Sequence, residues 1–159
     1  GRIKAMPEKI AINIIVAENF SLMNTSANEK EITLKNSLNE NLEFFADYDM
    51  INTVMRNLIS NAIKFTPEKG TIEIIERKVS DHKIEIGISD SGIGIEAETL
   101  SKLFSTDSHI STSGTNNEAG TGLGLKLCKE LIERNNGEIF IESEVGKGTT
   151  VWISLPIKQ

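Results

Sequence analysis

The chain has 159 residues, of which 38% are hydrophobic, 25% are charged and one is cysteine. This length is typical of one domain, and the single Cys128 excludes an internal disulfide framework and fits a reducing compartment. The net charge of −6 argues against non-specific nucleic-acid binding, which needs a basic surface. No apolar run approaches the ~20 residues that cross a bilayer. We therefore expect a cytoplasmic domain without direct membrane insertion, and the parent protein could still be membrane-anchored.

Residues 1–30 are interpreted as a linker and helix at the cut end of a longer chain, because no initiator methionine opens the sequence. A helix is predicted from Pro7 to about Ala27, since proline suits a first helical turn and apolar residues recur at near-helical spacing. The apolar positions used for this prediction are Ile10, Ile14, Ala17, Phe20 (or Leu22) and Met23.

Alternating apolar and polar residues predict the next elements, within a domain assigned to residues 31–159. Two strands are expected near residues 32–35 and 42–47, separated by the polar turn 37–41. Asp47 or Asp49 can cap a helix that runs to about Phe65, where Thr66 and Pro67 end it. Residues 70–89 predict a hairpin with its turn at residues 80–82.

The second half begins with a short helix expected from Ile95 to Leu103. Residues 105–119 contain ten Ser, Thr, Asn or Gly and predict a mobile lid, because they cannot bury enough apolar surface to become ordered. A helix from about Gly122 to Asn135 follows, with Leu123, Leu127 and Leu131 as its apolar stripe, and then strands at 138–143 and 149–155. This element order predicts an α+β fold, a two-layer sandwich whose mixed, mostly antiparallel sheet is covered by helices on one face.

Three polar residues share one edge of the helix that ends at Phe65. Asn57, Asn61 and Lys64 fall within about 60° of one another. Amide oxygens can coordinate Mg²⁺, and a lysine can supply positive charge to phosphate. A plain polar patch beside the buried face is the alternative. That face is predicted to contain Ile51, Val54, Met55, Leu58 and Ala62.

Two glycine-containing segments have the composition of nucleotide-binding loops. In DSGIGI, residues 90–95, the Asp90 carboxylate can accept a hydrogen bond from the amino group of adenine. A tight turn in which Asp90 only caps a helix is an equal alternative. AGTGLGL, residues 119–125, leads into a helix whose N-terminus favours phosphate. It is neither a dinucleotide fingerprint nor a P-loop, because the required strand and Gly-Lys-Ser/Thr are missing.

Together these motifs closely resemble the ATP-binding catalytic domain of sensor histidine kinases, in the superfamily of gyrase, chaperone, histidine-kinase and mismatch-repair ATPases. The resemblance covers roughly Ile32 to Pro156. It implies a Bergerat-type fold with ATP and Mg²⁺ as cofactors. The motifs occur in the family order: NLISNAIKFT (57–66), DSGIGI (90–95), LSKLF (100–104), GTGLGL (120–125) and GKGTTVWISLP (146–156).

The resemblance also implies residue roles. Asn61 would be the principal Mg²⁺ ligand, assisted by Asn57, while Lys64 would contact phosphate and Phe65 would lie against the nucleotide. Asp90 would select adenine, and Thr150 would support the base through water, with Thr149 as its rival. Further nucleotide contacts would come from Gly92, Gly94, Ile95, Leu103, Phe104, Gly120, Thr121, Gly122, Leu123 and Gly124.

Asn57 discriminates between activities within the superfamily. The hydrolysing members, and serine kinases of the anti-sigma type, tend to have a glutamate at this position, and an amide cannot act as that base. The resemblance therefore implies a protein-histidine kinase that transfers the γ-phosphate of ATP to a separate acceptor. The 105–119 lid has no Lys or Arg, however, which keeps open a nucleotide-binding module without transfer. A hydrolytic ATPase is the third alternative.

Neither histidine of the chain has the features of an acceptor. His82 lies in the predicted hairpin turn and His109 lies in the predicted lid. The phosphorylated histidine is therefore expected on a dimerisation domain of the same protein, with a response-regulator receiver domain as the next partner. The isolated fragment is expected not to autophosphorylate.

Overall fold

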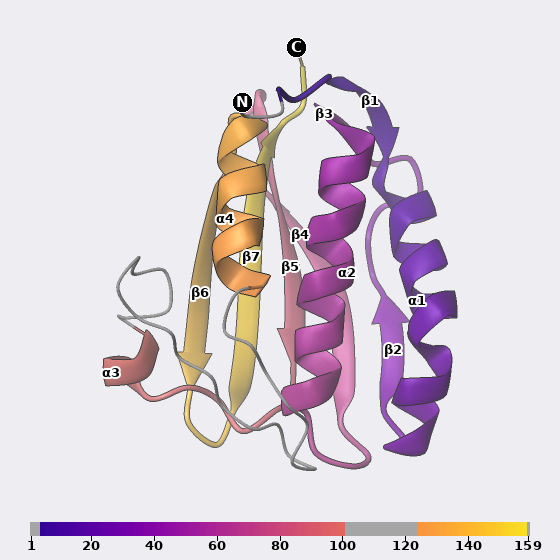
Figure 1. Ribbon diagram of the computed structural model, residues 1–159, viewed down its shortest axis with the longest axis vertical. Coiled ribbons are helices and arrows are strands. Elements are labelled where there is room, and N and C mark those ends of the chain that lie inside the picture. The colour runs from indigo at the N-terminus through magenta and orange to yellow at the C-terminus, as the bar shows by residue number, and fades with distance from the viewer. Residues whose placement is uncertain (1–3, 101–123, 159) are drawn as a thin grey trace.

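A computed structural model describes residues 4–100 and 124–158, and its five-stranded sheet is covered on one face by helices (Figure 1). The strands are β2 (Thr33–Asn36), β4 (Thr71–Lys78), β5 (Lys83–Asp90), β6 (Glu138–Glu144) and β7 (Gly148–Pro156). Their order is β2-β4-β5-β7-β6, with β2 parallel to β4 and the other neighbours antiparallel. The covering helices are α1 (Ile12–Glu29), α2 (Tyr48–Phe65) and α4 (Gly124–Arg134). This arrangement confirms the predicted α+β sandwich.

The segment after Pro7 differs from its prediction. It starts as strand β1 (Glu8–Ala11), which pairs antiparallel with β3 (Glu43–Ala46) in a separate two-stranded sheet. The expected helical start at Pro7 is therefore wrong, because pairing with a distant strand outweighs the local helical spacing. The register sets Ile10 opposite Phe44, and both side chains are buried.

The late start of α1 changes which of its faces is buried. The buried positions are Ile12, Ile15, Val16, Asn19 and Ala27, which follow helical spacing counted from Ile12. The predicted positions are therefore confirmed only in part: Phe20 and Met23 pack against the core, whereas Ile14 and Leu22 are 54% and 65% exposed. The helix itself was predicted, but which of its residues face the core depends on the residue at which it begins.

Helix α2 lies over the centre of the sheet and matches its prediction closely. Asp47 is its N-cap, since Asp47 Oδ1 accepts a hydrogen bond from the Met50 N–H at 3.1 Å. Thr66 is its C-cap, as expected before Pro67. All five predicted core positions of α2 are buried, against sheet isoleucines such as Ile72, Ile74, Ile86 and Ile88. Burying each isoleucine contributes about 1.5–3 kcal/mol.

Helix α4 buries the predicted leucine stripe only in part: Leu131 is partly buried and packs against the core, and Leu123 lies outside the described residues. Its buried residues are Cys128 and Ile132, whereas Leu127 is 42% exposed. Burial raises the pKa of the Cys128 thiol to about 12, so this cysteine is a core residue rather than a nucleophile. The helix ends before Asn136, whose positive φ of 61° forms the expected C-terminal turn. The short α3 (Ala97–Leu100) follows the end of β5.

Candidate functional site

Asp90 is the last residue of the central strand β5, where the chain leaves the sheet and enters a loop. The N–H groups of Gly92 and Thr149 donate to its Oδ1 at 2.8 and 3.2 Å. Desolvation raises the pKa of Asp90, and these two N–H groups oppose the rise in part. With Oδ1 held by the backbone, Oδ2 has no hydrogen-bond partner among the described residues and can accept one from a ligand.

The turn after Asp90 has no room for side chains at two of its glycines. A Cβ at Gly92 would lie 2.6 Å from the Phe65 carbonyl oxygen and 2.7 Å from Asp90 Oδ1. Gly94 has a φ of +77°, and a Cβ there would overlap the Glu144 backbone. The Ile95 N–H donates to Ser143 Oγ at 2.8 Å, which ties the turn to β6. The two glycines therefore let the turn pack against α2 and β6.

The register of β7 distinguishes the two candidate threonines. Thr149 pairs with Asp90 and Thr150 pairs with Ser89. Paired residues share a face of a sheet, and Asp90 alternates in phase with the buried Ile86 and Ile88. Thr149 therefore lies beside Asp90 on the helix-covered face. The Thr150 hydroxyl lies on the opposite face and donates to Ser89 Oγ at 3.0 Å, so the structure does not bring Thr150 to the carboxylate.

Asn57 and Asn61 lie on α2 where the first residue of α4 approaches it. A Cβ built on Gly124 would be 3.6 Å from Asn57 Oδ1 and 3.8 Å from Asn61 Nδ2. The Asn57 Nδ2 donates to the Thr53 carbonyl oxygen at 3.0 Å, which turns Oδ1 away from its own helix backbone. Both amides are thus brought together with the N-terminus of α4, the end of a helix that favours anions.

Lys64 and Phe65 complete the last turn of α2. The Lys64 ammonium lies 5.6 Å from the centre of the Phe65 ring. The Phe65 carbonyl oxygen accepts a hydrogen bond from the Ile93 N–H at 3.5 Å, so this turn contacts the loop that follows Asp90. The remaining predicted contacts lie outside the described residues: Leu103, Phe104, Gly120, Thr121, Gly122, Leu123 and the 105–119 lid.

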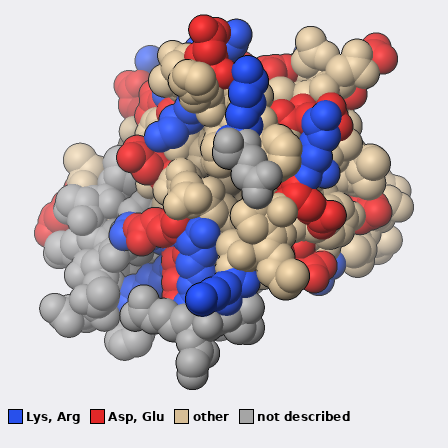
Figure 2. Space-filling view, turned by 90° about the horizontal axis from the view of Figure 1, so that it is seen from above, with Lys and Arg blue, Asp and Glu red and all other residues tan. Residues whose placement is uncertain are grey.

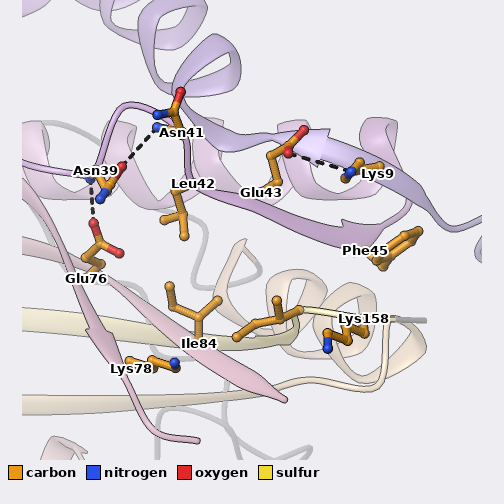
Figure 3. Close-up of a pocket in the computed structure, with 11 residues that line it drawn as sticks. Lys9, Asn39, Asn41, Leu42, Glu43, Phe45, Glu76, Lys78, Ile84 and Lys158 are labelled. Carbon is orange, nitrogen blue, oxygen red and sulfur yellow. Dashed lines mark hydrogen bonds and ion pairs between the residues drawn. The ribbon is translucent and has the colours of Figure 1, made fainter. Parts of the chain in front are cut away.

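A hollow at the opposite end of the molecule was not predicted (Figure 3). Ile84, near the start of β5, lies in its wall, whereas Asp90 ends the same strand. Lysine and acidic side chains alternate over this end, as the view from above shows (Figure 2). The sequence gives no signal for this hollow because its lining comes from five separate segments. These residues are Lys9, Asn39, Asn41, Leu42, Glu43, Phe45, Glu76, Lys78, Ile84, Ile157 and Lys158.

Comparison with known proteins decides the family. Residues 46–159 match the sequence model of the histidine kinase-, DNA gyrase B-, and HSP90-like ATPases. The chain belongs to this family. The match includes α2, the Asp90 turn, α4 and the closing hairpin β6–β7, which are the elements that bring the candidate site together.

Individual relatives agree with this assignment. The chain is 35% identical over 133 residues to the autoinducer 2 sensor kinase/phosphatase LuxQ of Vibrio parahaemolyticus, and 35% identical over 127 residues to the sensor histidine kinase WalK of Bacillus subtilis. These alignments cover 80% and 79% of this chain but only 15% and 21% of the two relatives. The nucleotide-free catalytic domain of histidine kinase ThkA superposes with a TM-score of 0.80 at 27% identity, covering 97% of this chain and 99% of that one.

This family member is thus a histidine kinase-like ATPase domain of the sensor-kinase type. Within the described residues, no helix combines the length and the apolarity needed to span a membrane. The division at residue 30 and the individual residue roles stay predictions.

Proposed function

We propose that this domain binds Mg²⁺-ATP and donates the γ-phosphate to a histidine outside the chain, as the catalytic part of a two-component sensor kinase. The observation that carries the proposal is the pairing of two separate polar clusters around the last turns of α2. A half-buried, oriented carboxylate at Asp90 contacts that helix through Gly92, and two amides lie beside the N-terminus of α4. One cluster is suited to adenine and the other to a metal-bound phosphate.

The residues fit a Mg²⁺ ion that is shared with the nucleotide. Magnesium prefers hard oxygen ligands and keeps several waters or phosphates in its shell. Asn57 and Asn61 each provide one amide oxygen, and the hydrogen bond of Asn57 to Thr53 leaves its Oδ1 as an acceptor. Bound there, the ion would supply positive charge to the phosphates, to which Lys64 adds a second cation.

Phosphoryl transfer from this site needs positioning rather than a covalent intermediate. The bond between the γ-phosphorus and its bridging oxygen breaks, a phosphorus–nitrogen bond to the acceptor histidine forms, and ADP remains. Asn57 supports transfer over hydrolysis because its amide cannot accept a proton from water. Asp90 and its turn would hold the base while the amides and Lys64 hold the triphosphate.

The partners follow from the same proposal. The acceptor histidine lies on a dimerisation domain of the parent protein, and a response-regulator receiver domain takes the phosphate from it. Support comes from a solved complex of histidine kinase ThkA with the response regulator protein TrrA, in which the kinase chain matches 95% of this domain at 25% identity, with a TM-score of 0.77.

Calorimetry and a transfer assay together test the proposal. The wild-type chain should bind Mg²⁺-ATP, and Asn61→Ala should lose most of the affinity gained from Mg²⁺ while binding metal-free ATP as before. Labelled ATP should then phosphorylate a matching histidine-bearing helical domain added in solution. Binding without transfer to any such domain would favour a nucleotide-binding module, and rapid steady-state phosphate release by the chain alone would favour a hydrolytic ATPase.

A further inference from the structure

Lys30 is a buried cation that no step of the proposed function uses. It directly follows α1 and is only 4% exposed, although lysine is almost never buried unless paired. Its backbone is fixed on both sides, because the Lys30 N–H donates to the Ala27 carbonyl at 3.1 Å and the Lys30 carbonyl accepts from the Lys69 N–H at 2.9 Å. The side chain therefore starts from a fixed point and must find its partner inside the protein.

That partner is the C-terminus of α2. The Lys30 Nζ donates to the Ile63 carbonyl oxygen at 2.8 Å and to the Lys64 carbonyl oxygen at 3.2 Å. These are two of the last four carbonyls of the helix, which have no intrahelical donor and hold the negative end of the helix dipole. A buried ammonium at this place satisfies both carbonyls and offsets their partial charge.

The same turn holds the site together. Asn61 lies one turn before it, Lys64 and Phe65 lie within it, and the Phe65 carbonyl accepts from the Ile93 N–H of the adenine-side loop. If the last turn frays, the amides, the phosphate-side lysine and the loop after Asp90 lose their common support. Lys30 lies 33 residues before Ile63, directly after another helix.

We propose that Lys30 is a positioning residue of the nucleotide site, which holds the last turn of α2 so that Asn61, Lys64 and the loop after Asp90 share one geometry. This inference rests on the proposed function, because it concerns the same Mg²⁺-ATP site. Residues that orient metal ligands from outside the site typically change affinity about 10–100-fold when removed. We expect Lys30→Met, which keeps an unbranched apolar side chain but removes the ammonium donors, to bind Mg²⁺-ATP at least about tenfold more weakly.

The experiment separates this positioning role from a general loss of stability. Ile84→Val is the matched control, because it trims a buried side chain at the far end of β5. Both variants should melt below the wild type, but only Lys30→Met should lose Mg²⁺-ATP affinity in calorimetry. Amide hydrogen exchange gives a readout without nucleotide: exchange at residues 63–65 should accelerate in Lys30→Met and not in Ile84→Val.

Each outcome decides between the two proposals. If wild type binds Mg²⁺-ATP and folded Lys30→Met binds equally well, or if its exchange at residues 63–65 is unchanged, the role of Lys30 is overturned while the proposed function stands. If wild type binds no Mg²⁺-ATP, the proposed function fails, and the role of Lys30 in the site fails with it. Should Lys30→Met not fold, Lys30→Gln is decisive. Its shorter amide keeps a donor, so an intermediate affinity supports the proposal and wild-type affinity overturns it.

Discussion

The two ends of helix α2 are held in different ways. At the N-terminus, Asp47 accepts a hydrogen bond from the Met50 N–H, three residues away along the chain. At the C-terminus, the carbonyls of Ile63 and Lys64 accept from Lys30, which lies in a different part of the sequence. Among the described residues, no hydrogen bond joins the first end to a predicted site residue, whereas the second end carries Asn61, Lys64 and Phe65. From this comparison we expect the first end to contribute stability and the second end, under the proposed function, to contribute binding.

The strongest test of this division is Asp90→Asn, next to the C-terminal end. The substitution replaces one carboxylate oxygen with an amino group. That group must then face either the N–H groups of Gly92 and Thr149 or the amino group of adenine, so two donors oppose each other. We expect calorimetry to show an affinity for Mg²⁺-ATP at least about 100-fold lower.

Asp81→Asn is the matched control, because Asp81 is an exposed carboxylate near the other end of β5, paired with Lys78 at 3.3 Å. It should bind as the wild type does. Equal affinity in the wild type and in folded Asp90→Asn would place adenine recognition elsewhere. It would also contradict the expectation that the C-terminal end of α2 contributes binding.

The reverse experiment is Asp47→Ala, at the N-terminal end. Asp47 Oδ1 caps the helix and its Oδ2 accepts from the Met6 N–H at 2.9 Å. Losing an N-cap of this kind costs about 1–2 kcal/mol, which chemical denaturation should detect as a lower unfolding midpoint. Affinity for Mg²⁺-ATP at a temperature where the protein is folded should not change. Asp49→Ala, the other carboxylate of this end, should alter stability by less than about 0.5 kcal/mol; a similar loss in both variants would mean that the cap is not specific.

This contrast also explains what sequence alone could predict. The span and caps of α2 were predictable because Asp47, the apolar spacing and Pro67 are local signals. Strand β1 was missed because four residues take their conformation from pairing with β3, more than thirty positions away. Lys30 gave no signal, since a lysine after a helix is ordinarily solvated and its partners come from the end of another helix. The Asp90 turn was predictable from its glycines. The hydrogen bond from the Thr149 N–H to Asp90 was not, because it depends on the register between β5 and β7.

The threonine pair tests that register directly, with a smaller expected effect. A one-residue shift in a strand reverses which face each side chain occupies. Thr149 lies beside Asp90, so Thr149→Val should weaken Mg²⁺-ATP binding about threefold through a lost hydroxyl contact. Thr150→Val removes a hydroxyl that bonds Ser89 on the other face and should leave the affinity unchanged. The opposite ranking in calorimetry would show that Thr150, the first choice from the sequence, supports the base.

The smallest effect concerns the charge of Asp90 in the folded protein. Desolvation raises its pKa above the ordinary value of 3.8, and the N–H groups of Gly92 and Thr149 only partly oppose this. Between the unfolded and the folded pKa, the folded state binds more protons than the unfolded state, so the unfolding free energy falls as pH rises through that window. Asp90→Asn is uncharged throughout.

The lower bound of this pH window is near 3.8. As pH falls through the window, the wild type should therefore gain unfolding free energy relative to Asp90→Asn. Other carboxylates titrate in the same range, but they are shared by both proteins and cancel in the difference. Denaturant unfolding at a series of pH values measures it. A flat difference would mean that the two backbone donors balance burial, and one that moves in favour of Asp90→Asn would mean that they outweigh it. Asp90 would then be a stabilising charge, and the C-terminal end of α2 would hold its site without the cost of a desolvated carboxylate.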